Sequence, residues 1–179
     1  MMKIKKYISY FKIANNLREN ISNSSKRRNN SKFPFFFKKV KNYLLNMLAF
    51  TCPVNSWRVQ FHRWRGVNIG KSVFIGLRCT LDHAYPEYIY LEDNAALSGN
   101  DYILCHSNPQ EHFSHVLESF VAPVVIKKGT WITINVTVLP GVTIGENCVI
   151  GAGATISKNI KDKTIVTQSK KSLISTHYE

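Results

Sequence analysis

A six-residue period between Ile126 and Ile156 constrains the fold of this chain more than any other feature. An aliphatic residue opens each frame, and a small or β-branched residue follows four positions later. The openers are Ile126, Ile132, Val138, Ile144, Ile150 and Ile156. A period of six matches neither a 3.6-residue helix nor the two-residue alternation of an isolated strand. It predicts a solenoid whose equivalent positions stack, and six consecutive frames disfavour accidental periodicity in another β-rich domain.

The same period extends toward the N-terminus, and turn-forming residues fall between its strands. The turn-formers are Gly129, Asn135, Gly141, Asn147 and Gly153. The earlier openers are Ile69, Ile75, Leu81, Leu91, Leu97 and Ile103. The frame slips between His83 and Tyr88 and breaks again from Cys105 to about Pro123. We expect both irregularities to be loops at corners of one continuous all-β solenoid.

The segments Trp131–Gly145 and Val149–Lys158 resemble the signature of the hexapeptide-repeat acyltransferases. The similarity is clearest to the galactoside, maltose and surface-polysaccharide O-acetyltransferases, and it covers roughly Val67 to Lys171. The resemblance implies a left-handed parallel β-helix. The left hand comes from the resemblance alone, because crossover connections between parallel strands are otherwise right-handed in about 98% of cases.

The length of 179 residues suggests one domain with an appendage. We expect residues 1–66 to form a basic, mainly helical N-terminal extension and residues 67–165 to form the β-helix, with a loop insertion at 106–123. Residues 166–179 are expected to be a C-terminal tail.

The cysteines and the lack of sorting signals indicate the cellular compartment of the protein. Cys52, Cys79, Cys105 and Cys148 show no CxxC spacing, which favours reduced thiols in a reducing compartment. Lysines and asparagines interrupt the apolar residues near the N-terminus, so no secretory signal is recognisable. No segment reaches the ~18 apolar residues of a membrane span. We therefore expect a cytoplasmic protein.

Charge is distributed unevenly along the chain. Residues 1–66 contain 15 of the 24 lysines and arginines but one acidic residue, Glu19, whereas residues 67–179 are close to neutral. Residues 33–50 add a phenylalanine-rich segment to a lysine cluster, a composition typical of an interfacial helix on anionic lipid. Residues 1–50 are therefore candidates for peripheral contact with the inner membrane face. A helix capping the open end of the solenoid is an alternative, compatible interpretation; nucleic acid binding lacks any recognition motif.

Residues 53–65 are predicted to form a second helix, with Asn55 or Ser56 as its N-cap. Three aromatic residues spaced four and three positions apart would lie on one face of this helix. We expect that face to pack on the first coil of the solenoid; its residues are Trp57, Phe61 and Trp64.

Acetyl transfer from a thioester to a hydroxyl requires a base, and histidine suits this role because its pKa lies near neutrality. The resemblance implies a catalytic histidine about two dozen residues before the signature tryptophan. His106 lies 25 residues before Trp131, so we assign it as the general base; without the resemblance it would be taken for an exposed loop histidine. A carboxylate is expected to orient it, with Asp82 preferred because sugar-acetylating relatives carry an aspartate there. The other candidates are Asp101, Glu111 and Glu118.

The resemblance also implies a set of contacts to acetyl-CoA, the expected acyl donor. Trp131 would flank the reaction site and Lys158 would meet the nucleotide phosphates as a point charge. Thr133 replaces a glycine, so the backbone there is less free to approach a ligand. Small and apolar positions would line the pantetheine. The complete set is Trp131, Thr133, Ile134, Ala152, Ser157, Lys158 and Lys171.

These features predict an O-acetyltransferase acting on a sugar hydroxyl in bacterial surface polysaccharide biosynthesis (capsule, exopolysaccharide or O-antigen), with a lipid-linked precursor as one form of the acceptor. The resemblance implies a homotrimer with active sites between adjacent solenoids. Phe74–Arg78 lacks the asparagine that contacts the acceptor in sugar-acetylating relatives, so acceptor recognition differs from theirs.

Three other functions stay open. One is a serine or nucleotide-sugar acetyltransferase. Another is a metal-dependent hydratase on the same fold, although no histidine spacing reproduces the expected ligand pattern and we expect no metal; its candidate ligands are His83, His106, His112 and His115. The last is a non-catalytic scaffold, suggested by Thr133, by Glu92 in a usual glycine position and by an altered C-terminal turn.

Overall fold

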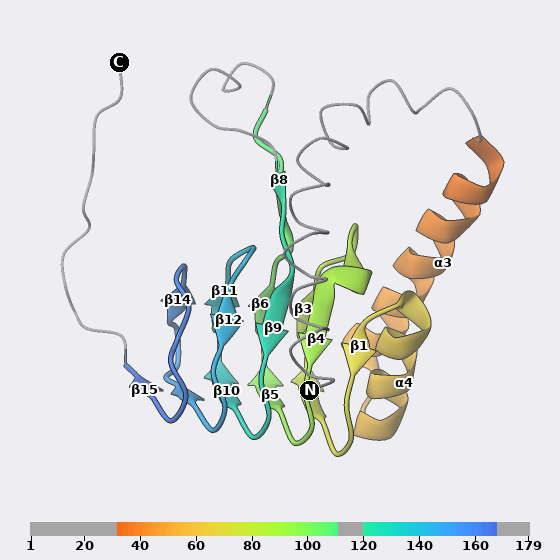
Figure 1. The fold of residues 1–179 in the computed structure, drawn as a ribbon. Helices are drawn as coiled ribbons and strands as arrows, with labels where there is room; N and C mark the ends of the chain where they lie inside the picture. The colour runs from red at the N-terminus through yellow and green to blue at the C-terminus, as the bar shows by residue number, and fades with distance from the viewer. Residues whose placement is uncertain (1–31, 111–119, 168–179) are drawn as a thin grey trace, which may run out of the picture.

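A computed structural model describes residues 32–110 and 120–167. In these ranges the chain forms a parallel β-helix with two helices at its N-terminal end (Figure 1). The β-helix has three flat faces, which the chain visits in the order A, B, C in every coil. The predicted boundaries of the extension and tail are not tested by these ranges, and they stay predictions.

Each face is a parallel sheet with one strand from each coil. Face A contains β1 (Asn68–Ile69), β4 (Ile89–Leu91), β9 (Val124–Ile126) and β12 (Thr143–Ile144). Face B contains β2 (Phe74–Leu77), β5 (Ala96–Gly99), β10 (Trp131–Ile134), β13 (Val149–Ile150) and β15 (Ile165–Val166). Face C contains β3 (Thr80–Leu81), β6 (Tyr102–Ile103), β11 (Thr137–Val138) and β14 (Thr155–Ile156).

The predicted frame openers form the core. Ile132 pairs in register with Leu97 on one side and Ile150 on the other, and all three side chains are fully buried. Equivalent ladders run through faces A and C. Glu92, which stands in a usual glycine position, does not interrupt the coil, and its carboxylate accepts a hydrogen bond from the Lys128 amide of the next coil.

The turn-forming residues lie at the corners in left-handed backbone conformation. Asn135 and Asn147 have φ of 58° and 53°, and Gly129, Gly141 and Gly153 have φ of 69°, 84° and 73°. Glycine and asparagine tolerate this region better than other residues. This requirement explains why they recur between the frame openers.

Both irregularities in the period fall at the corner between face C and face A, in successive coils. The first contains the short helix η1 (Pro86–Tyr88). The second leaves the coil as an antiparallel pair of strands, β7 (His106–Ser107) and β8 (Phe120–Val121), which projects beyond the coils in Figure 1. Because successive coils stack, the two insertions lie next to each other.

Helix α4 (Asn55–Arg65) covers the open end of the first coil, and α3 (Lys32–Thr51) packs against α4. The predicted packing face of α4 is wrong. Trp57 and Trp64 are 62% and 55% exposed, and the buried residues of α4 are Arg58, Val59, His62 and Arg65.

The reason for this reversal lies in the unpaired carbonyl groups of the first coil, which has no preceding coil to bond. Arg58 Nε donates to Ile75 O at 2.7 Å on face B, and Arg63 Nη2 donates to Gly70 O at 2.8 Å on face A. Arg65 Nη2 donates to two carbonyls at the end of β3 on face C. Buried backbone acceptors require partners, so this end of the solenoid selects arginine over tryptophan.

The predicted N-cap is also wrong, because Val54 occupies that position and makes no side-chain cap. The Asn55 side chain instead bonds the first strand on face B, donating to Val73 O and accepting from the Ile75 amide.

Candidate active site

His106 and Asp82 lie in contact at the corner between faces C and A. His106 begins β7 and Asp82 follows β3 in the coil below, so the two insertions bring them together. His106 Nδ1 lies 2.6 Å from Asp82 Oδ2. A carboxylate only accepts hydrogen bonds, so Nδ1 carries a proton, and in the neutral imidazole the lone pair that can act as a base is then on Nε2.

Asp82 is a buried carboxylate with a complete set of donors. Its Oδ2 also accepts from the Cys105 amide, and its Oδ1 accepts from the amides of Ala84 and Tyr85. Burial alone raises the pKa of Asp82, but these amides and His106 outweigh it and hold the pKa below its ordinary value. Asp82 is therefore a stable anion facing the imidazole.

Arg65 supports the Asp82 backbone from below. Its Nη2 donates to the carbonyls of Leu81 and Asp82 at 3.0 and 2.9 Å. Its Nη1 donates to His62 Nδ1 at 2.9 Å. Burial lowers the pKa of His62 to about 3, with the charges of Arg65 and Arg58 adding to the effect. Neutral His62 thus accepts from Arg65 and fixes the direction of the guanidinium.

The His106 ring is accessible from solvent, with its side chain 26% exposed. Tyr85 lies against one side, with ring centroids 5.4 Å apart, and His83 meets it edge-on at 6.3 Å. Within the described ranges, no protein group is hydrogen-bonded to Nε2. That nitrogen is therefore open to a substrate hydroxyl.

The structure distinguishes between two of the carboxylates considered as partners of His106. Asp101 accepts from the amides of Val136 and Gly99 and bonds no histidine. Its role is to join two coils at the corner between faces B and C. Glu111 and Glu118, like the ligand candidates His112 and His115, lie outside the described residues.

The residues expected to contact acetyl-CoA do not lie beside His106 in the same chain. Trp131, Thr133 and Ile134 are in β10 on face B, which is opposite the corner between faces C and A. Trp131 is 51% exposed, and its indole Nε1 donates to Ser98 Oγ at 2.7 Å. The Thr133 hydroxyl donates to Ile150 O of the next coil, so it has a structural partner.

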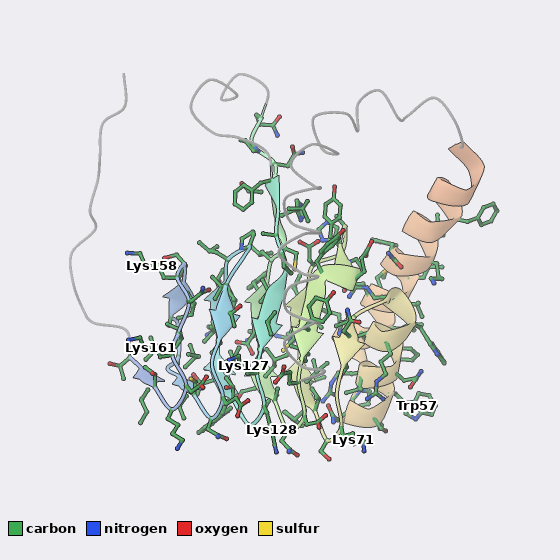
Figure 2. All side chains as sticks on the ribbon, viewed as in Figure 1. Trp57, Lys71, Lys127, Lys128, Lys158 and Lys161 are labelled. Carbon is green, nitrogen blue, oxygen red and sulfur yellow. The ribbon has the colours of Figure 1, made fainter. Side chains whose placement is uncertain are left out.

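The remaining predicted contacts lie farther along the solenoid. Ala152 is exposed at the turn after β13. Ser157 and Lys158 are exposed after β14, at the same corner between faces C and A as His106 but two coils farther along. Figure 2 shows Lys158 near the end of the solenoid remote from α3 and α4. Lys171 lies outside the described residues. Among the described residues, no cluster of three or more His, Cys, Asp or Glu side chains is arranged to hold a metal ion.

Sequence reasoning missed Arg65, His62 and Tyr85 as neighbours of the site. An arginine four positions before the first frame opener, Ile69, is a weak signal of a buried residue, because basic side chains are usually exposed. The Tyr85 position depends on the fold of the slip between His83 and Tyr88, which the period does not specify.

Comparisons with known proteins agree with this architecture. The family model described as bacterial transferase hexapeptide (six repeats) matches residues 123–158. YvoF of Bacillus subtilis, whose name places it among the acetyltransferases, is 30% identical over 145 residues, which are 80% of this chain and 81% of that protein. The galactoside O-acetyltransferase of Escherichia coli K12 is 28% identical over 140 residues, covering 76% of this chain and 68% of that protein.

Among solved structures, the chain is similar to the hexapeptide-repeat acetyltransferase VCA0836 of Vibrio cholerae, crystallised with acetyl coenzyme A. The TM-score is 0.62 at 17% identity, and the match covers 75% of this chain and 84% of that one. The expected left-handed parallel β-helix is thereby confirmed.

Proposed function

Because the chain belongs to the hexapeptide-repeat acetyltransferases, we propose that it transfers the acetyl group of acetyl-CoA to a sugar hydroxyl during bacterial surface polysaccharide biosynthesis. The observation that carries the proposal is the contact between His106 Nδ1 and the buried Asp82 carboxylate. This arrangement gives an oriented base at a solvent-accessible corner, which O-acetyl transfer requires.

The proposed reaction uses His106 twice. Nε2 accepts the proton of the attacking hydroxyl while its oxygen forms a bond to the thioester carbonyl carbon. The resulting imidazolium is stabilised by Asp82, as in other histidine–carboxylate pairs. When the carbon–sulfur bond breaks, His106 returns the proton to the departing thiolate, so the products are the acetyl ester and coenzyme A.

The exposed side chains of face B fit the acyl donor. Trp131 and Ile134 are 51% and 46% exposed, and Ala152 adds a small side chain in the next coil. Such an apolar surface suits the uncharged pantetheine arm. Lys158 is not on face B but at the corner between faces C and A of the last coils, where it would supply a cation for phosphate. Thr133 contributes backbone only, because its hydroxyl bonds Ile150 O.

The position of face B supports the proposal of a homotrimer. Within one subunit, side chains on face B point away from the opposite corner of the β-helix, where His106 lies. A complete site therefore requires His106 from one subunit and Trp131 from its neighbour. Closed cyclic symmetry supplies such an arrangement at every interface.

The acceptor is proposed to be a sugar because one relative is named a galactoside O-acetyltransferase. Phe74–Arg78 lacks the expected acceptor-binding asparagine, which favours a polysaccharide sugar or its lipid-linked precursor over a free galactoside. The buried, unpaired thiols of Cys79, Cys105 and Cys148 are consistent with the cytoplasm, where acetyl-CoA is available.

The test is turnover by the His106→Ala variant with acetyl-CoA and a panel of sugar, serine and amine acceptors. We expect turnover to fall about 10²–10⁴-fold, the usual contribution of a general base, while acetyl-CoA binding measured by calorimetry is retained. His83→Ala is the matched control, because His83 is an exposed neighbour of the same type. Near wild-type turnover in His106→Ala would refute the assignment, and no acetyl-CoA binding by the wild type would favour the scaffold.

A further inference from the structure

We propose that the N-terminal end of the molecule is a docking surface for an anionic lipid bilayer. The surface, called here the cap face, is formed by exposed apolar side chains of α3 and α4. Its residues are Val40, Tyr43, Leu44, Met47, Leu48, Trp57 and Trp64. The inference concerns binding alone, and it does not depend on the proposed acetyl transfer.

Helix α3 exposes more apolar surface than an ordinary surface helix. Its exposed side carries Tyr43, Leu44 and Met47, which are 63%, 53% and 52% exposed. Its inner side mixes two polar residues, Asn42 (only 5% exposed) and the partly buried Asn46, with buried Ala49 and partly buried Leu45. A surface helix in water normally turns its apolar stripe inward. The exposed stripe of α3 is therefore available to a second apolar medium.

The inner side of α3 also buries polar atoms that lack hydrogen-bond partners. The side-chain oxygens of Asn42 and Asn46 are buried, and neither has a hydrogen-bond partner among the described residues. Unpartnered buried amides are costly. The inward position of these two amides is explained if the apolar side chains on the exposed side of α3 contact another apolar medium.

Aromatic residues of α4 extend the same surface. Trp57, Phe61 and Trp64 form a continuous row, with neighbouring ring centroids 6.5 and 5.8 Å apart. Figure 2 shows Trp57 projecting from the helical end of the molecule, beyond the first coil. Tryptophan and tyrosine are enriched where a membrane meets water, because one end of the ring is apolar and the other polar.

Charge favours lipid over a second copy of this chain. The segment from residue 32 to 66 contains seven lysines and arginines and no acidic residue. Two of the seven, Arg58 and Arg65, are buried against the first coil, and the other five carry the positive charge of this end of the molecule. Lys41 of α3 and Arg63 of α4 are exposed. Two copies of this face would repel each other, whereas an anionic bilayer attracts clustered basic residues.

Docking would occur at the bilayer surface. Within the described ranges, no helix has both the length and the apolar character to cross a membrane. A basic helix with an aromatic apolar face lies in the interface plane instead. The cap face has both features.

The test is cosedimentation of the full chain with vesicles of phosphatidylcholine containing about one-third phosphatidylglycerol. We expect binding to these vesicles, reduced by salt and weaker on pure phosphatidylcholine. The double variant Leu44→Glu, Met47→Glu should bind at least about tenfold more weakly, since it removes apolar contact area and adds repulsive charge. Ile165→Glu is the matched control, because it makes the same kind of change at a 72% exposed site at the far end of the solenoid, and it should bind like the wild type.

Two results would overturn the proposal. Equal binding by wild type and double variant would assign vesicle binding to the basic residues 1–31 instead. Absence of vesicle binding by the wild type, together with a smaller particle by light scattering for the double variant, would show that the cap face joins copies of the chain.

Discussion

At the scale of single residues, the site depends on groups whose protonation is set by burial and by hydrogen bonds. Asp82 stays ionised because four donors surround it. His62 stays neutral because burial, with a smaller contribution from the charges of Arg65 and Arg58, lowers its pKa to about 3. Asp101 is the opposite case, because burial raises its pKa to about 6. His62 and Asp101 therefore change stability in opposite directions on acidification.

We predict that the His62→Gln variant will differ from the wild type in the pH dependence of stability. The ordinary pKa of 6.5 applies to His62 in the unfolded chain, and its folded pKa is about 3. Between these values the unfolded state binds the extra proton, so the wild type loses stability as pH falls below 6.5, by about 1.4 kcal/mol per pH unit at most. Glutamine can accept from Arg65 without titrating.

Urea unfolding at pH 7 and pH 4.5 measures this difference. The stability of the wild type relative to His62→Gln should decrease at the lower pH. The His62 ring proton signals in NMR should also stay unchanged over the same range. A His62 that titrates near pH 6, with parallel pH profiles for both proteins, would contradict the prediction.

At the scale of elements, the coils are regular because each corner requires a residue that tolerates positive φ. Most corners use glycine or asparagine, but Arg78 has φ of 59° at the corner between faces B and C of the first coil. Asn135 holds the equivalent position two coils later, with φ of 58°. Both side chains are exposed, so backbone strain dominates the comparison.

Exchanging the residue types at these two corners gives a matched pair of predictions. Arg78→Asn should raise the free energy of unfolding by about 0.5–1 kcal/mol, because asparagine enters the left-handed region more easily than arginine. Asn135→Arg should lower it by a similar amount. Urea denaturation of both variants measures the changes, and shifts of the same sign in the two would refute the explanation.

The coils could be predicted from the sequence because each frame opener becomes one buried rung of a ladder. Ile132 and Ile150, for example, are adjacent frame openers of face B and pair in register. The helical cap could not be predicted in this way. Its aromatic spacing indicated a packing face, but the buried side is set by open carbonyls such as Ile75 O, which select Arg58. These acceptors become visible only once the first coil is formed.

The candidate site was predictable in part for the same reason. His106 was identified through a family resemblance, and Asp82 was one of several carboxylates that the sequence left open. The two contact each other because both insertions lie at one corner of successive coils. The two insertions share a corner because of the way the coils stack in register. The sequence pattern indicates this register only after each loop has been assigned to a corner.

At the scale of the whole molecule, face B and the corner carrying His106 are on opposite sides of the β-helix. A single subunit therefore presents two incomplete halves of the proposed site. The assembly rather than the chain is the catalytic unit in this proposal.

We predict that two inactive variants will restore activity when they are mixed by coexpression. His106→Ala lacks the base and Trp131→Ala lacks the donor-binding surface, but a mixed trimer contains an interface with both residues intact. Random assembly in equal amounts should recover about a quarter of wild-type activity, because about three-quarters of the trimers then have one intact site in three.

Turnover of the coexpressed proteins, compared with each variant alone, measures the recovery. A mixture as inactive as its components, in trimers shown to be mixed by mass, would place both residues in the same subunit. As a control, Asn135→Arg is coexpressed with His106→Ala. Both kinds of subunit then keep Trp131, and only the Asn135→Arg subunits contribute His106.

His106 and Asp82 lie in the first two coils, next to α4, and this position fixes the distance between the candidate site and the cap face. With the cap face on a bilayer, one or two helix diameters of about 10 Å and two coil spacings of ~4.8 Å separate the reacting hydroxyl from the lipid headgroups. Additional coils lengthen the molecule on the far side and leave this distance unchanged. A glycan growing outward from a lipid anchor would thus be acetylated on the sugars nearest the anchor.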